Sequence, residues 1–161
     1  MDARNPTSAA DTRNPVSTAN LMGHPLHPIL ITLPIGLFAA TFLCDLLYWI
    51  TAEAAFATAA IWLLGFGLLA AALAAVAGLI DFLGDRRVRD ISDAWQHAIG
   101  NVVLVLLQLF SFYYRYRHGA SAVVPVGLSL SLIAMLIMVF TGWKGGELVF
   151  RHRVAVYDEP R

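Results

Sequence analysis

The sequence is poor in charge and almost free of cysteine. Only 14% of its 161 residues are charged and the formal net charge is zero, whereas soluble domains carry about a quarter charged residues. A neutral chain offers no basic surface for nucleic acid, so we expect no nucleic-acid partner. Cys44 is the single cysteine, which excludes an intramolecular disulfide and a cysteine-based metal motif.

Signatures of common enzymes are also missing. The chain has no nucleophile–base pair and no nucleotide-binding loop of the kinds that mark hydrolases, kinases and ATPases. The sequence therefore favours a non-enzymatic role and leaves a redox subunit open.

Apolar residues dominate instead. They make up 58% of the chain and form four blocks that are near or above the roughly 18–20 residues needed to span a bilayer as a helix. The sequence predicts an all-α integral membrane protein, a four-helix bundle of up-down topology with spans at about 28–50, 56–82, 94–114 and 125–150. This transmembrane domain covers 23–156, between a flexible polar tail, 1–22, and a short tail, 157–161.

The charges predict how the bundle lies in the membrane. Four spans put both termini on one side, which holds most of the basic residues: Arg4, Arg13, Arg86, Arg87, Arg89, Lys144, Arg151, Arg153 and Arg161. Only Arg115 and Arg117 fall on the other side. Because cytoplasmic loops carry the excess of basic residues, we expect cytoplasmic N and C termini and a location in the inner (cytoplasmic) membrane.

Two histidines flank the start of the first span, in the order Gly23-His24-Pro25-Leu26-His27-Pro28. The prolines restrict the backbone here, so His24 and His27 would lose little entropy on binding a metal or a haem iron. A proline-rich entry with histidines among the lipid headgroups is the alternative.

His97 lies one turn into the third span. Asn101 follows four residues later on the same helical face, and Gly100 leaves a gap beside the histidine. A polar face that opens toward the bundle interior predicts a cofactor pocket. The alternative is a histidine in water at a helix start.

Other ionisable residues complete the candidate site. The candidate cofactor-binding residues are His24, His27, His97 and His152, of which the first three are also candidate metal ligands; Asp81, Lys144 and Glu147 form a supporting polar cluster. We expect Glu147 to pair with Arg151 four residues later, and Asp45 to pair with Arg115 or Arg117.

The two halves of the chain share a weak pattern. Each half starts a helix with histidine and ends the next helix with glycine and an acid: His27 to Gly78 and Asp81, then His97 to Gly142 and Glu147. Parallel repeats of this kind occur in membrane proteins.

These motifs resemble the DUF2231 family of predicted bacterial membrane proteins. The resemblance rests on Gly23–Pro28 with Leu33-Pro34-Ile35-Gly36, on Gly78–Phe82, on the helix start at His97 and on the Gly142–His152 ending, and covers about 22–156. Arg153 departs from the pattern, where a small residue, often glycine, is expected. The resemblance implies a four-helix membrane domain in a redox neighbourhood, since related domains are joined to Rieske iron–sulfur or cytochrome modules, and it assigns no reaction.

Three functions are consistent with this sequence. The leading hypothesis is a membrane electron-transfer protein that binds haem b near the cytoplasmic face, with His27 or His24 and His97 as axial ligands. The second is binding or transport of a divalent metal ion by the same cluster. Transport needs a polar path across the membrane, and the outer half, which we expect to be mostly apolar, offers mainly Asp45 for it. The third is a structural or assembly subunit. The expected partners are the lipid bilayer and a soluble or membrane redox protein.

Overall fold

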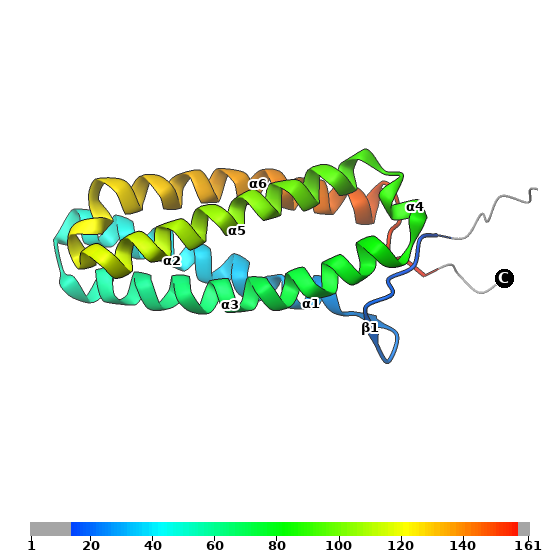
Figure 1. Ribbon diagram of the computed structural model, residues 1–161, viewed down its shortest axis with the longest axis horizontal. Coiled ribbons are helices and arrows are strands. Elements are labelled where there is room, and N and C mark those ends of the chain that lie inside the picture. Colours follow the sequence, from blue (N-terminus) through cyan, green and yellow to red (C-terminus); the bar gives the residue numbers. More distant parts are fainter. Residues whose placement is uncertain (1–13, 158–161) are drawn as a thin grey trace, which may run out of the picture.

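The computed structural model describes residues 14–157, in which long helices lie lengthwise beside one another (Figure 1). Of the residues that the structure describes, 83% are helical, which confirms the prediction of a helical protein. Two short strands, β1 (Asn20–Leu21) and β2 (His24–Pro25), pair antiparallel just before the first helix.

The helices follow in a simple order along the chain. Their bounds are α1 Leu26–Leu30, α2 Thr32–Thr51, α3 Ala54–Gly84, α4 Arg86–Arg89, α5 Ser92–His118 and α6 Leu128–Phe150. A 3₁₀ turn, η1 (Gly119–Ala122), and a π turn, η2 (Val123–Gly127), join α5 to α6. Helices α1 and α2 are separated at Ile31, because Pro34 has no N–H to bond the carbonyl of Leu30 and its ring crowds that group.

Three segments are candidate membrane spans by their length and apolar composition. They are Leu26–Thr51, Ala54–Gly84 and Ser92–Phe150. The third segment includes both α5 and α6, which reverse direction at η1 and η2 and pack side by side (Figure 1). The number of crossings therefore stays a prediction.

Neighbouring helices pack through small residues. Helix α2 packs on α3 and α6, and α5 packs on the same two helices, so α2 and α5 lie diagonally across the bundle. The buried face of α3 is mostly alanine and glycine: Ala57, Ala60, Leu64, Gly67, Ala71, Ala74 and Ala77. Small residues let the helices approach closely; a Cβ at Gly67, for example, would lie 2.6 Å from the Phe38 ring. The outward faces carry exposed leucine, valine and aromatic side chains, as suits contact with lipid.

The two halves of the bundle share a pattern of buried positions. The buried residues of α2 recur on α5 seventy positions later, as the pairs Pro34 and Leu104, Phe38 and Gln108, Thr41 and Ser111, and Asp45 and Arg115. This burial pattern supports the repeat expected from the sequence.

Residues 14–25, the N-terminal strap, cover one end of the bundle. The Asp81 carboxylate accepts hydrogen bonds from the Ala19 N–H (2.7 Å) and the Ser17 hydroxyl (2.9 Å). The Thr18 side chain lies against Gly84, where a Cβ would collide with it. Residues 14–22, expected to belong to a flexible tail, thus hydrogen-bond to the end of α3; residues 1–13 lie outside the described chain.

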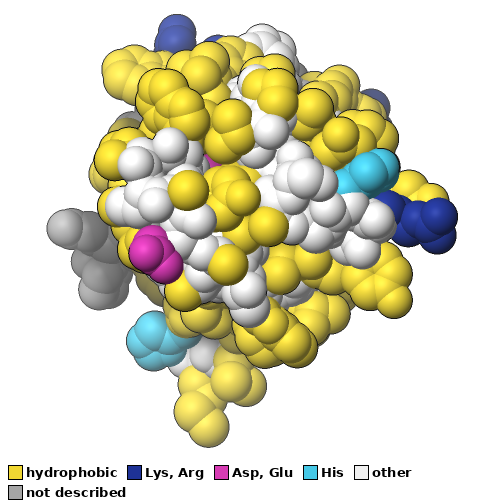
Figure 2. Space-filling view, turned by 90° about the vertical axis from the view of Figure 1, so that its left-hand side faces the viewer, with side chains coloured by type: hydrophobic (Ala, Val, Ile, Leu, Met, Phe, Trp, Pro, Cys, Tyr) yellow, Lys and Arg dark blue, Asp and Glu magenta, His cyan; other side chains and the backbone are white. Residues whose placement is uncertain are grey.

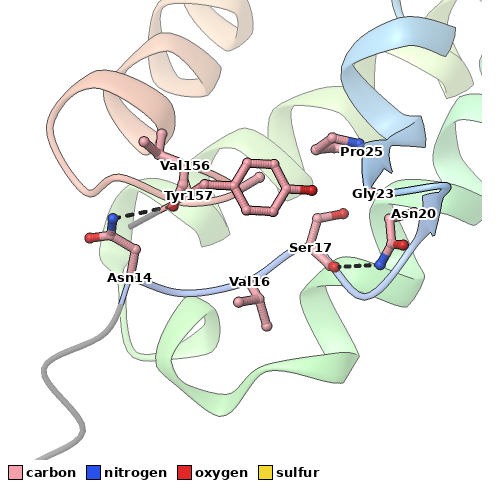
Figure 3. Close-up of a pocket in the computed structure, with 9 residues that line it drawn as sticks. Asn14, Val16, Ser17, Asn20, Gly23, Pro25, Val156 and Tyr157 are labelled. Carbon is pink, nitrogen blue, oxygen red and sulfur yellow. Dashed lines mark hydrogen bonds between the residues drawn. The ribbon is translucent and has the colours of Figure 1, made fainter. Parts of the chain in front are cut away.

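Both ends of the described chain lie at this end of the bundle (Figure 1). The Ala155 N–H donates to the Pro15 carbonyl (2.9 Å), and the Asn14 side-chain amide donates to the Val156 carbonyl (3.2 Å). A cavity of about 410 Å³ lies between the strap and the C-terminal segment (Figure 3). Neither His27 nor His97 is part of its lining.

Candidate functional site

His27 and His97 lie together inside the bundle. Their ring centroids are 6.1 Å apart and their planes meet at 88°. His27 belongs to α1 and His97 to the first turns of α5, seventy positions apart, the same interval that separates the recurring buried residues of α2 and α5. Both side chains are half-buried. The structure therefore brings together two of the four histidines that the sequence nominated.

Each histidine is held by a backbone carbonyl of a neighbouring helix. Nδ1 of His27 lies 2.8 Å from the Ala74 carbonyl of α3, and Nδ1 of His97 lies 2.9 Å from the Thr141 carbonyl of α6. A carbonyl only accepts hydrogen bonds, so Nδ1 carries the proton in both rings. A neutral ring of this tautomer presents the lone pair of Nε2, which is how metal-ligating histidines are usually oriented.

A glycine lies against each ring, one turn beyond the carbonyl. A Cβ at Gly78 would lie 2.8 Å from the His27 ring, and a Cβ at Gly145 would lie 3.1 Å from the His97 ring. Gly145 is thus the counterpart of Gly78, in place of the expected Gly142, which faces open space. The gap expected beside Gly100 is filled by the Thr141 side chain.

Asn101 makes the two histidines unequal. Its side-chain nitrogen lies 3.2 Å from Nε2 of His97 and donates to the His97 carbonyl at 2.8 Å, on the helical face that the spacing predicted. The corresponding residue beside His27 is Ile31. Within the described residues, Nε2 of His27 has no hydrogen-bond partner, so it is the freer of the two lone pairs.

The other two candidate histidines lie elsewhere. His24 is exposed in the strap, with Nδ1 3.2 Å from the Met22 carbonyl. His152 follows α6, and its Nε2 lies 2.9 Å from the Asp93 carboxylate. Their assignment as ligands stays a prediction.

The supporting residues likewise bind other partners. Asp81 holds the strap, Lys144 donates to Asp93 at 2.8 Å, and Glu147 pairs with Arg151 at 3.5 Å as predicted. Asp93, which joins the start of α5 to the end of α6, was not among the predicted site residues. The sequence does indicate the position of Asp93 through its spacing. Asp93, His97 and Asn101 are four residues apart and therefore lie on one helical face.

A second polar centre lies toward the opposite end of the bundle. Arg115 donates to both carboxylate oxygens of Asp45, each at 2.7 Å, and both side chains are fully buried. The Arg115 guanidinium also donates to Ser111 and to Ser131 of α6, and the Ser131 hydroxyl donates to Asp45. The predicted pairing of Asp45 is thereby confirmed, with Arg115 as the partner.

This pair corrects the expectation of a mostly apolar outer half. The end of the bundle away from the strap does show mainly hydrophobic surface with few charged groups (Figure 2). Its interior nevertheless contains the buried polar residues Thr41, Asp45, Gln108, Ser111, Arg115 and Ser131. The expectation is wrong for the interior. These polar residues are scattered singly among apolar ones along the sequence, so they do not stand out as a polar segment there.

Potential metal ligands occur only in small groups in the described part of the chain. Among residues 14–157 there is no group of three or more His, Cys, Asp or Glu side chains placed to hold a metal ion. The His27–His97 pair thus offers two protein ligands.

A family comparison covers most of the chain. The family model described as "Predicted membrane protein (DUF2231)" matches residues 23–158, most of the chain. The chain belongs to the DUF2231 family. Together with the three candidate spans, this identifies the DUF2231 chain as a membrane protein. Neither a curated protein nor a solved structure matches it.

Proposed function

We propose that this DUF2231 protein binds a b-type haem through His27 and His97 and serves membrane electron transfer. One observation carries the proposal: two histidines from diagonal parts of the bundle lie 6.1 Å apart, each with Nδ1 on a carbonyl. Metal–imidazole bonds are about 2.0–2.1 Å long, so two imidazoles on one metal have centroids roughly 6 Å apart. At this separation both imidazoles would hold one haem iron, with the Asn101 amide released from Nε2 of His97.

The number of ligands favours haem over a bare metal ion. A structural zinc site needs about four protein ligands and a catalytic one about three, whereas haem iron takes only its axial ligands from the protein. The chain supplies two imidazoles here and no third ligand among the described residues. When bound, the haem would supply one-electron chemistry; the histidines would hold it and the carbonyls would fix their tautomer.

We further propose four crossings, by α1 with α2, by α3, by α5 and by α6. Aromatic side chains are exposed at both ends of these helices, Trp49, Tyr113 and Tyr116 at one end and Trp95 and Trp143 at the other, as is typical of the two membrane interfaces. The sequence placed two basic residues, Arg115 and Arg117, on the outer side. Since Arg115 is buried in the bundle, only Arg117 of these two is exposed there. The charge asymmetry is thus stronger than the sequence suggested, which supports cytoplasmic termini in an inner membrane.

Reporter fusions test this topology. A reporter that works only in the cytoplasm is expected to be active when fused after Val156 and inactive when inserted in η1. A reporter that works only on the outer side of the membrane is expected to show the reverse. Equal cytoplasmic activity at both sites would contradict the four crossings.

The visible spectrum of the purified protein tests the haem proposal. A Soret band with a reduced-form spectrum typical of two axial histidines supports it. A colourless protein with a stoichiometric divalent metal supports the metal-binding alternative. The third outcome is a colourless, metal-free protein that was prepared from haem-replete membranes and stays colourless after haemin is added. This outcome would contradict both haem binding and metal binding and would leave the role of a structural subunit.

A further inference from the structure

Gln108 of α5 carries a buried oxygen atom that has no hydrogen-bond partner. The side chain is 1% exposed, and Oε1 is unpartnered within the part of the chain that the structure describes. Buried polar atoms in proteins almost always bond to protein or to an ordered water. In a bilayer this need is stronger, because the surrounding lipid offers no hydrogen bonds.

A second unused hydrogen-bonding group lies one turn along the same helical face. Ser111 follows Gln108 by three residues and is fully buried. Its oxygen accepts the Arg115 Nε–H at 3.3 Å. Within residues 14–157 the hydroxyl proton of Ser111 has no acceptor, so a donor and an acceptor without partners occur on one face of α5.

The other half of the bundle lacks this feature. Phe38 occupies the position equivalent to Gln108, and its ring packs on Gly67. Thr41 occupies the position equivalent to Ser111 and donates to the Leu37 carbonyl at 2.8 Å. The unpaired groups are therefore specific to α5.

We propose that Gln108 and Ser111 bind a buried water molecule. The water would donate to Gln108 Oε1 and accept from the Ser111 hydroxyl, which uses both unpartnered groups. It would extend the Asp45–Arg115–Ser111–Ser131 network one turn further into the bundle.

The chemistry of the site excludes other small ligands. A hard cation needs about six oxygen ligands, whereas Gln108 and Ser111 offer two. The Arg115 guanidinium is matched by the Asp45 carboxylate, so no net positive charge attracts an anion. Water is small, neutral and able to donate and accept at once, and internal waters typically make two to four hydrogen bonds.

The polar centre ends at this water. The next buried residue on the same face is Leu104, and Pro34 is its counterpart on α2. Ala71 belongs to an apolar cluster on which Val105 and Met138 pack. An apolar layer thus separates the water site from the histidine pair, and the water completes a buried network without opening a path across the bundle.

Infrared difference spectroscopy in H₂¹⁶O and H₂¹⁸O tests the proposal. The full-length protein is expected to show an ¹⁸O-sensitive band of a water that does not exchange its hydrogen bonds with bulk solvent. Gln108→Met removes the acceptor at nearly constant length and is expected to abolish the band and to lower the melting temperature. Gln96→Met, at an exposed glutamine of the same helix, is the matched control and keeps both.

Two results would overturn the proposal. One is a band of the same intensity in the Gln108→Met variant. The other is a melting temperature of Gln108→Met at or above that of Gln96→Met, which would mean that the amide oxygen is unpartnered in the membrane as well. Should Gln108→Met not fold, Ser111→Ala tests the water from its other side; loss of the band supports the bridge and an unchanged band contradicts it.

Discussion

Asp45 and Arg115 occupy equivalent positions in the two halves of the chain and bind each other across the bundle. The two hydrogen bonds between them are 2.7 Å long. Their helices lie diagonally and pack on the same two neighbours rather than on one another. The pair therefore joins the halves through the centre, about 27 Å along α5 from His97 if each of the 18 intervening steps rises 1.5 Å.

Removing either partner of this pair is expected to destabilise the protein severely. Asp45→Ala or Arg115→Ala leaves one buried charge uncompensated, which typically costs about 3–5 kcal/mol. Thermal unfolding in detergent measures the loss, with Arg117→Ala, at an exposed arginine, as the control. A change as small as that of the control would show that the ion pair does not hold the halves together.

Exchanging the two charges tests the equivalence of the positions. The double variant Asp45→Arg with Arg115→Asp rebuilds the pair in the reverse direction, so it is expected to be more stable than either single charge reversal. We expect the double variant to recover only part of the lost stability. Ser111 and Ser131 accept hydrogen bonds from the arginine at position 115, and they stay in place when the arginine moves to position 45. A double variant no more stable than the single reversals would contradict a symmetric arrangement.

Alanine at the glycines beside the histidines should displace the rings. Gly78→Ala brings a methyl group to 2.8 Å from His27, and Gly145→Ala brings one to 3.1 Å from His97. Overpacking of this kind costs about 1–3 kcal/mol, and we expect the larger loss at Gly78.

Gly142 provides the matched control for these variants. A Cβ there meets nothing within 4 Å, and alanine is favoured over glycine inside a helix by roughly 1 kcal/mol. Gly142→Ala should therefore leave the melting temperature unchanged or raise it. Equal effects of all three substitutions would argue against close packing of the histidines on glycine.

Asp81 is predicted to anchor the strap rather than to support the histidines. Asp81→Ala removes the acceptor for Ala19 N–H and Ser17, so hydrogen exchange at the Ala19 amide should accelerate about tenfold or more, as expected for a bond worth about 1.5–3 kcal/mol. Asp90→Ala, at an exposed acid of the same end, should not change it. Unaltered exchange in Asp81→Ala would show that other contacts hold the strap.

Asp85 should make the strap sensitive to acid. The hydrogen bonds from the Arg87 side chain lower the pKa of this carboxyl below its ordinary value of 3.8, and the bond from Val16 N–H acts in the same direction. A lowered pKa in the folded state means that the carboxylate stabilises the fold above pH 3.8 and that this contribution is lost as the pH falls through the folded-state pKa.

The Asp85→Asn variant measures this contribution. At pH 7 the wild type should protect the Val16 amide from exchange better than the variant does, and the difference should shrink below pH 3.8. A difference that stays constant down to the lowest accessible pH would mean that the charge of Asp85 plays no part.

Local sequence spacing predicted the contacts within one helix. The pairing of Glu147 with Arg151 and the placement of Asn101 beside His97 both follow from the four-residue repeat of a helix, and the structure confirms them. The helical class followed equally from the long apolar blocks.

Contacts between distant helices were harder to predict. Nothing in the sequence distinguishes His27 from His24, because only the packing of α1 on α3 brings one of them to the Ala74 carbonyl. Arg115 follows an aromatic cluster and was counted as an outer residue; α5 continues to His118 and carries it into the bundle. The polar residues His97, Asn101, Gln108, Ser111 and Arg115 do recur every three, four or seven positions on one face of α5, which was the available signal.

The central claim is that His27 and His97 form one ligand pair, and a spectroscopic comparison of histidine variants tests it most directly. His27→Ala and His97→Ala, each purified from haem-replete membranes, are predicted to lose the Soret band and the reduced-minus-oxidised difference spectrum of the wild type. His24→Ala and His152→Ala, which replace the two histidines outside the pair, are predicted to keep both signals. Wild-type spectra in His27→Ala and His97→Ala, or their loss in His24→Ala or His152→Ala alone, would contradict the pair as the site of haem binding.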